Sequence, residues 1–169
     1  MTWLDIPAIL LITGLLIALA SVALTFGSES RWVGHAVTGT IALVLMFAVI
    51  LTGAVQRGRI RAIRIHSIFR FHRMLSIGFS AFVVGTFILG LLTTMEHGEP
   101  VLQSVHGLLG LIVAILALVQ LVPSLVTTRR TGIRLPHMII GYLIVPLLLL
   151  QVVIGLGEAG FIPPFIPLN

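Results

Sequence analysis

Four histidines in this sequence are each followed, four residues later, by glycine or serine. They are His35 with Gly39, His72 with Ser76, His106 with Gly110 and His137 with Gly141. Residues four apart lie on one face of an α-helix, so each imidazole would stand over a position with little or no side chain. A neutral imidazole nitrogen is a common metal ligand. The pattern therefore indicates four similar helices that present ligands and leave room for something flat.

The composition indicates where these helices must lie. Of 169 residues, 58% are hydrophobic and only 9% are charged. A water-soluble domain of this size needs far more polar surface, so the sequence predicts an integral membrane protein. It contains no cysteine, which excludes disulfides, thiolate metal sites, iron–sulfur clusters and covalently attached c-type haem.

Five uncharged runs are long enough to cross a bilayer, which takes roughly 20 residues. They are Ile6–Phe26, Val33–Val55, Met74–Thr94, Val101–Val126 and Met138–Leu156. The fold expected is an all-α integral membrane protein with five transmembrane helices, the last four forming an up-down bundle. Its parts are an N-terminal helix and outer loop (1–32), the bundle (33–157) and a proline-rich outer tail (158–169). The first run contains no histidine, so we interpret it as a packing helix.

The charges predict how the chain is oriented. All ten basic residues are arginines, and nine of them lie in the two connections 57–73 and 129–134. These connections fall on the same side of the membrane, and positive loops stay cytoplasmic. We therefore expect a plasma-membrane protein with a cytoplasmic N-terminus and an outer C-terminus. Topology and attraction to anionic membrane lipid account for the net charge of +5 without a nucleic-acid partner.

On this topology the histidines form two pairs. His35 and His106 would lie near the outer face, and His72 and His137 near the inner face. Alternate helices of an up-down bundle stand diagonally across its core. Two inward imidazoles placed in this way can bind the iron of a porphyrin from both sides. The sequence thus predicts two non-covalent haem b groups, with Gly39, Gly110, Gly141 and Ser76 clearing space for the macrocycles. The remaining histidines, His66 and His97, are interpreted as solvated loop residues.

Haem propionates are anionic and need hydrogen-bond donors nearby. On the inner side, Arg70, Arg73 and Arg134 lie close in sequence to the inner pair. On the outer side, Arg31, Gln103 and Ser104 lie close to the outer pair. We predict that propionate contacts come from these residues.

Four helices with histidines on the first and third, and on the second and fourth, resemble the cytochrome b561 family. The resemblance covers about Val33 to Leu156 and implies two b-type haems, one near each membrane face, held by His35 with His106 and His72 with His137. The chain differs from eukaryotic members in having no sixth helix and no lysine-bearing inner substrate site. This difference favours a membrane quinol or a redox protein over ascorbate as the partner.

The function expected is transmembrane electron transfer, as a protein or as a subunit of an oxidoreductase. Bis-histidine ligation leaves iron no open position, which disfavours oxygen activation. One alternative is the membrane-anchor cytochrome of a larger quinone oxidoreductase. Another is a non-redox assembly factor or transporter, which would need carboxylates inside the bundle, and the five runs contain none. The sequence leaves open whether the chain forms a homodimer or joins a larger complex.

Overall fold

The fold is described here from a computed structural model, which describes residues 28–58, 68–98, 100, 103–125 and 131–160. Four α-helices make up this part of the chain: α2 (Ser28–Gln56), α3 (Ile68–Glu96), α4 (Val105–Leu125) and α5 (Thr131–Glu158). All four are long and apolar enough to cross a membrane. The first expected span, Ile6–Phe26, lies outside the described residues, as do His66, most of the basic connections and the end of the proline-rich tail.

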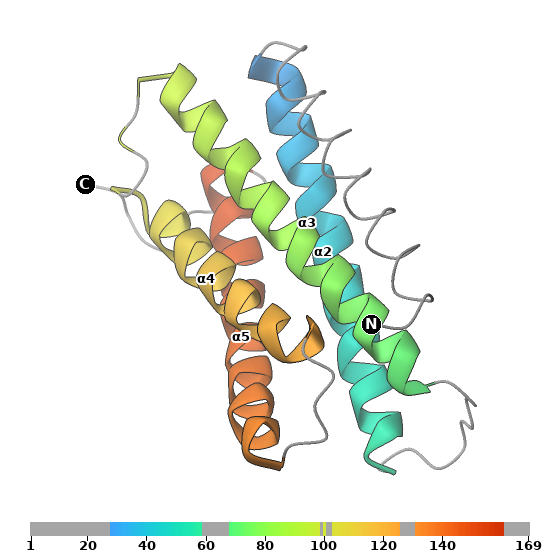
Figure 1. Cartoon of the computed structure of the whole chain (residues 1–169). Coiled ribbons are helices and arrows are strands. Elements are labelled where there is room, and N and C mark those ends of the chain that lie inside the picture. The colour runs from blue at the N-terminus through green and yellow to red at the C-terminus, as the bar shows by residue number, and fades with distance from the viewer. Residues whose placement is uncertain (1–27, 59–67, 99, 101–102, 126–130, 161–169) are drawn as a thin grey trace.

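The helices form an up-down bundle (Figure 1). Along the chain each helix packs on the next, and α2 also touches α5, which closes the ring. Helices α2 and α4 therefore stand diagonally across the bundle, as do α3 and α5. This is the arrangement that short connections between successive long helices favour.

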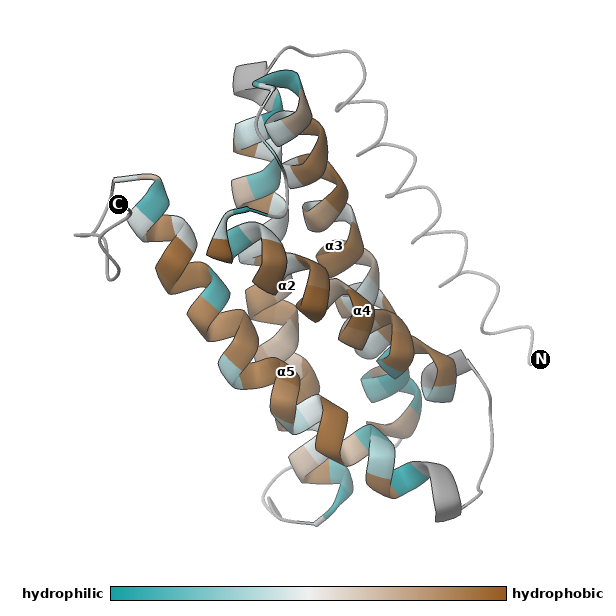
Figure 2. Cartoon of the chain, turned by 90° about the vertical axis from the view of Figure 1, so that its left-hand side faces the viewer, coloured by the Kyte–Doolittle hydropathy of each residue, from teal (hydrophilic) through white to brown (hydrophobic). Residues whose placement is uncertain are grey.

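The bundle has an apolar exterior and polar side chains in its interior. Large apolar side chains such as Val44, Phe47 and Ile115 are exposed, and apolar residues dominate the middle of every helix (Figure 2). The buried polar side chains are Thr38, Thr52, Ser76 and Ser80. Each donates its hydroxyl hydrogen to a backbone carbonyl. A bilayer demands this arrangement, because lipid offers no hydrogen bonds to an unpaired polar group.

All four helix starts differ from the expected spans, and α2 and α5 begin earlier than expected, at Ser28 and Thr131. Helix α3 begins at Ile68 rather than near Met74, so Arg70 and Arg73 lie in its first turns. Helix α4 begins later than expected, at Val105 instead of Val101. Ser104 fixes this start, because its hydroxyl oxygen accepts the backbone N–H of Gly107 at 2.9 Å. Such an N-cap satisfies an N–H that has no partner within the helix.

A small apolar core fills the middle of the bundle. It contains Ala42, Met46, Phe79, Val83, Val113, Ala114, Ala117, Ile144 and Leu148. All four helices contribute, and the four histidines lie beyond this core toward the helix ends. The fold thus separates one pair of histidines from the other by a layer of packed apolar side chains.

Candidate functional site

The first histidine pair joins the diagonal helices α2 and α4. The ring centroids of His35 and His106 are 5.9 Å apart, and their planes meet at 66°. Both side chains are partly buried. They line a cavity of about 550 Å³. We refer to this pair and its cavity as the His35–His106 site.

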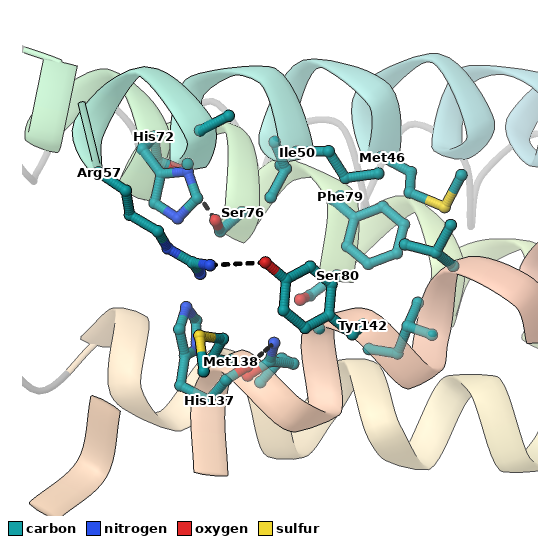
Figure 3. A pocket seen from close by; sticks show the side chains of 17 residues that line it. Met46, Ile50, Arg57, His72, Ser76, Phe79, Ser80, His137, Met138 and Tyr142 are labelled. Carbon is teal, nitrogen blue, oxygen red and sulfur yellow. Dashed lines mark hydrogen bonds between the residues drawn. The ribbon is translucent and has the colours of Figure 1, made fainter. Parts of the chain in front are cut away.

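The second pair joins the other diagonal, α3 and α5. The ring centroids of His72 and His137 are 6.4 Å apart, with an interplanar angle of 84°. A cavity of about 190 Å³ lies beside them, and Figure 3 shows the two rings at its polar end. We refer to this pair and its cavity as the His72–His137 site. The structure therefore brings together both pairs that the sequence predicts.

The separation within each pair suits two ligands on opposite sides of one metal ion. A transition metal binds an imidazole nitrogen at roughly 2 Å and the ring centroid lies about 1 Å further back, so such ligands have centroids roughly 6 Å apart. The observed 5.9 Å and 6.4 Å match this value. Among the described residues no group of three or more His, Asp or Glu side chains comes together. Two protein ligands per site suit a macrocycle that brings its own nitrogens.

Hydrogen bonds fix the ring nitrogens of two of these histidines. The Nδ1 atom of His35 lies 2.9 Å from the carbonyl oxygen of Thr86. A carbonyl only accepts, so this Nδ1 carries the hydrogen and Nε2 keeps its lone pair. The Nδ1 atom of His72 lies 3.0 Å from Thr52 Oγ1, whose own hydrogen goes to Ala48 O at 2.8 Å. Metal-binding histidines are commonly oriented by such a bond from their second nitrogen.

The other two histidines have a different environment. The Nδ1 atoms of His106 and His137 are buried, and neither has a hydrogen-bond partner among the residues that the structure describes. Buried polar atoms of this kind are few in folded proteins. The surrounding protein therefore does not fix these two rings through Nδ1 as it fixes those of His35 and His72. By its ring separation, its cavity and the lone pair on Nε2 of His35, the His35–His106 site fits a bis-histidine haem.

The two histidines of the His72–His137 site suit a haem, but the cavity beside them is smaller than a haem requires. Cofactor cavities usually measure about 300–1,000 Å³. The cavity of about 550 Å³ at His35 and His106 falls in this range, whereas the one of about 190 Å³ does not. Side chains that line the smaller cavity must move before it can hold a macrocycle.

Each of three histidine rings packs against a glycine of the adjacent helix. A Cβ on Gly90 would lie 2.9 Å from Cε1 of His35, and one on Gly53 would lie 3.3 Å from Cε1 of His72. At Gly155 the corresponding distance to Cε1 of His106 is 2.7 Å. A side chain at Gly90 or Gly155 would therefore force the facing ring to shift, and one at Gly53 would crowd the His72 ring more mildly. The sequence analysis missed all three glycines.

Two glutamines explain the glycines four residues after His106 and His137. Gln151 of α5 donates to the His106 carbonyl at 2.9 Å, and Gln120 of α4 donates to the His137 carbonyl at 2.7 Å. A Cβ on Gly110 would lie 3.1 Å from the Gln151 amide nitrogen, and one on Gly141 would lie 2.9 Å from that of Gln120. A helical side chain covers the turn before it, so a larger residue would block these bonds.

The other two small residues behave differently. The hydroxyl of Ser76 donates to the His72 carbonyl at 2.8 Å and is buried. Gly39 has no tight neighbour, since a Cβ there would lie 3.5 Å from Thr86 Cγ2. Gly39 and Gly110 both line the cavity at His35 and His106, and Gly141 and Ser76 line the smaller cavity. The small residue four positions after each histidine thus has more than one physical cause.

The arginines that the sequence predicts as propionate contacts are not those nearest the cavities. Arg70 and Arg134 are exposed, and Arg31 forms an ion pair with Glu96 at 2.7 Å that joins α2 to α3. None of these, nor Arg73, is among the residues that line the two cavities. On the outer side, Ser104 does line the larger cavity, although its oxygen also caps α4. Gln103 is exposed in the turn before α4.

Arg57 and Tyr142 are cavity residues that the sequence analysis did not select. Arg57 follows the last residue of α2, and its Nη1 donates to the Tyr142 hydroxyl at 2.8 Å. Its guanidinium carbon lies 5.6 Å from the centre of the Tyr142 ring. Both residues line the smaller cavity, and in Figure 3 the guanidinium points toward the space between His72 and His137. Arg57 is remote from both ligands along the chain, so only the packing of α2 against α3 and α5 reveals it.

The chain matches no protein-family model, no curated protein and no solved structure. What it does must therefore be argued from the site itself.

Proposed function

We propose that this chain is a transmembrane electron-transfer cytochrome b that holds two non-covalent haems between histidine pairs. One observation carries the proposal: four histidines from four helices converge on two cross-bundle pairs with centroids 5.9 Å and 6.4 Å apart. Bound haem would supply an iron that accepts and releases one electron at a time. His35 with His106, and His72 with His137, would be the axial ligands.

The ligand set supports electron transfer rather than chemistry on a bound substrate. With two histidines holding each iron, a bound haem would supply electron exchange and would not bind oxygen. The bonds from His35 to Thr86 O and from His72 to Thr52 hold these rings in one orientation. Fixed ligands favour rapid electron exchange, because little structure has to rearrange when the iron changes charge.

The placement of the sites at opposite helix ends supports a route across the membrane. We propose that the His72–His137 site is cytoplasmic and the His35–His106 site faces the outside of a plasma membrane, following the arginine distribution. A membrane quinol or a redox protein would then exchange electrons at one face. This arrangement is like that of the cytochrome b561 family, to which we propose that the chain is related.

Haem stoichiometry tests the proposal. Protein purified in detergent should be red, with low-spin b-type bands on reduction, and a pyridine hemochrome assay should return two haems per chain. Acidified acetone should extract all of it, because the chain has no cysteine for covalent attachment. His106→Ala and His137→Ala should each remove one haem and leave the other. A ratio near zero, or loss of both haems from each variant, would contradict the two-pair assignment.

Co-purification from native membranes tests whether the chain acts alone. A free-standing cytochrome should purify without a stoichiometric soluble redox subunit and be reduced by a quinol analogue. An anchor subunit should bring with it a flavin, iron–sulfur or multihaem protein at a fixed ratio.

A further inference from the structure

The His72–His137 site has a cationic group at its mouth that the His35–His106 site does not share among its described lining residues. Arg57 lines the smaller cavity, whereas the lining of the larger cavity contains no arginine and includes the carboxyl-bearing Glu158. Arg57 lines the same cavity as both His72 and His137. The two sites, similar in their ligands, therefore differ in the charge that faces them.

The hydrogen-bond donors of the Arg57 guanidinium are suited to binding a carboxylate. A guanidinium carries five N–H donors in a planar fork, and the bond to Tyr142 uses one of them. Its planar geometry is suited to binding both oxygens of one carboxylate. The Tyr142 hydroxyl accepts from Arg57 at 2.8 Å and so holds the guanidinium at the cavity mouth (Figure 3).

The same pair lies where the cavity reaches the surface. Arg57 and Tyr142 both line the cavity and are both exposed, so their side chains can move outward without opening the core. Such a movement would add room between His72 and His137 and keep the guanidinium within reach of an acidic group bound there.

We propose that Arg57, supported by Tyr142, is the carboxylate-binding group of the His72–His137 site and holds a propionate of the haem bound there. This inference rests on the proposed function. It replaces Arg70 and Arg134, which are exposed and absent from the cavity lining, as the propionate contact of that site.

The test compares Arg57→Gln with Arg70→Gln and Arg134→Gln, each purified as the full chain in detergent. Haem is counted per chain, and its rate of loss is followed by transfer to an excess of a haem-accepting apoprotein. Arg57→Gln should release one haem about tenfold faster or more, as expected for a lost charge-assisted hydrogen bond, and leave the other unchanged. Combination with His106→Ala, which retains only the His72–His137 site, identifies the haem affected. Arg57→Lys should be intermediate and Tyr142→Phe milder still.

The outcomes distinguish the role proposed for Arg57 from the proposed binding of haem by the histidine pairs. Retention of the second haem in Arg57→Gln shows that the bundle is intact, so a selective loss supports the assignment. Unchanged haem loss in Arg57→Gln, or an equally large effect of Arg70→Gln or Arg134→Gln, would overturn it while the haem pairs stand. Wild-type protein without haem would overturn the proposed function and this inference with it.

Discussion

At the scale of single residues, the site depends on what the glycines lack. An imidazole that crosses from one helix to a partner on the diagonal must pass over the helix beside it. Where three of the rings cross it, the adjacent helix has a glycine: Gly90 beside His35, Gly53 beside His72 and Gly155 beside His106. A methyl group at Gly90 or Gly155 would lie 2.9 Å or 2.7 Å from the facing ring, which would have to shift, whereas the 3.3 Å contact at Gly53 requires a smaller adjustment.

We expect Gly155→Ala to displace the His106 ring. The added Cβ would lie 2.7 Å from Cε1 and 3.2 Å from Nδ1, closer than non-bonded atoms approach. Alanine favours a helix over glycine by about 1 kcal/mol, so any loss of stability must come from this contact. Overpacking of this kind costs roughly 1–3 kcal/mol. Reduced difference spectra should show loss of low-spin character in one haem only, the one that His106→Ala removes.

Gly39→Ala is the matched control at the same site. Its Cβ would meet Thr86 Cγ2 at 3.5 Å, an ordinary contact. Both haems should therefore stay low-spin and fully bound in Gly39→Ala protein. If Gly39→Ala disturbs the same haem as strongly, the glycine serves to clear the macrocycle, as the sequence pattern alone suggested.

At the scale of helices, one spacing is repeated four times. Each histidine is followed at the same distance by a second small residue: Gly53, Gly90, Ser124 and Gly155. When two such helices pack antiparallel, each histidine falls opposite the small residue of its neighbour. His35 meets Gly90 and His72 meets Gly53 in this way. Helices α4 and α5 add a second repeat, since Gln120 and Gln151 also follow their histidines at equal distance.

The repeated spacing illustrates which features of the fold and of the site could be predicted from the sequence. Length, hydrophobicity and the i, i+4 pattern were enough to predict the helices after residue 28 and the pairing of His35 with His106 and His72 with His137. The partners of Gly110 and Gly141 could not be predicted, because a glycine shows only that space is needed and not what fills it. Arg57 could not be selected either, since its place depends on how the end of α2 meets α5.

A double-mutant cycle tests why Gly141 is small. In Gly141→Ala the new Cβ would lie 2.9 Å from the Gln120 amide nitrogen, so that amide must give up its 2.7 Å bond to the His137 carbonyl. Hydrogen bonds between membrane helices contribute about 0.6–1.7 kcal/mol. Alanine also favours the helix over glycine by about 1 kcal/mol, so we expect Gly141→Ala to be less stable in detergent than a control Gly→Ala change by about the value of this bond. This difference should disappear in a Gln120→Ala background.

The opposite result would point to the cofactor. If Gly141 is small because a macrocycle lies over it, Gly141→Ala should reduce occupancy of the haem at His72 and His137 whether or not Gln120 is present. Gly78→Ala is the control, because its Cβ would lie 3.9 Å from Leu45 Cδ1. It should show only the helix preference of alanine and leave the haem content unchanged.

At the scale of the whole molecule, one bundle contains two sites whose cavities differ in volume. The apolar core between them keeps water out of the middle of the bundle. The cavity of about 550 Å³ is large enough for a cofactor-sized group, whereas the side chains that line the one of about 190 Å³ must move to admit such a group. A site that must rearrange before binding loses part of its affinity to that rearrangement.

This inequality predicts an order of haem binding. Haem-free His137→Ala protein, which keeps only the His35–His106 site, should bind added haem more tightly than His106→Ala protein. We expect Kd values that differ by about tenfold, equivalent to roughly 1.4 kcal/mol of rearrangement. Spectroscopic titration of each variant measures both constants. Equal constants would mean that the smaller cavity opens without a measurable cost in free energy.

The last prediction concerns which site faces which side of the membrane. The chain has no cysteine, so a single introduced thiol can be followed without background. Gln56 is exposed at the end of α2 on the His72–His137 side, and Gln103 is exposed just before α4 on the His35–His106 side. In intact cells a membrane-impermeant maleimide should label Gln103→Cys and not Gln56→Cys, because arginine-rich connections stay in the cytoplasm. Lysis should make both thiols equally reactive. The reverse pattern would invert the proposed orientation without altering either histidine pair, whereas equal labelling in intact cells would show that no membrane separates the two ends.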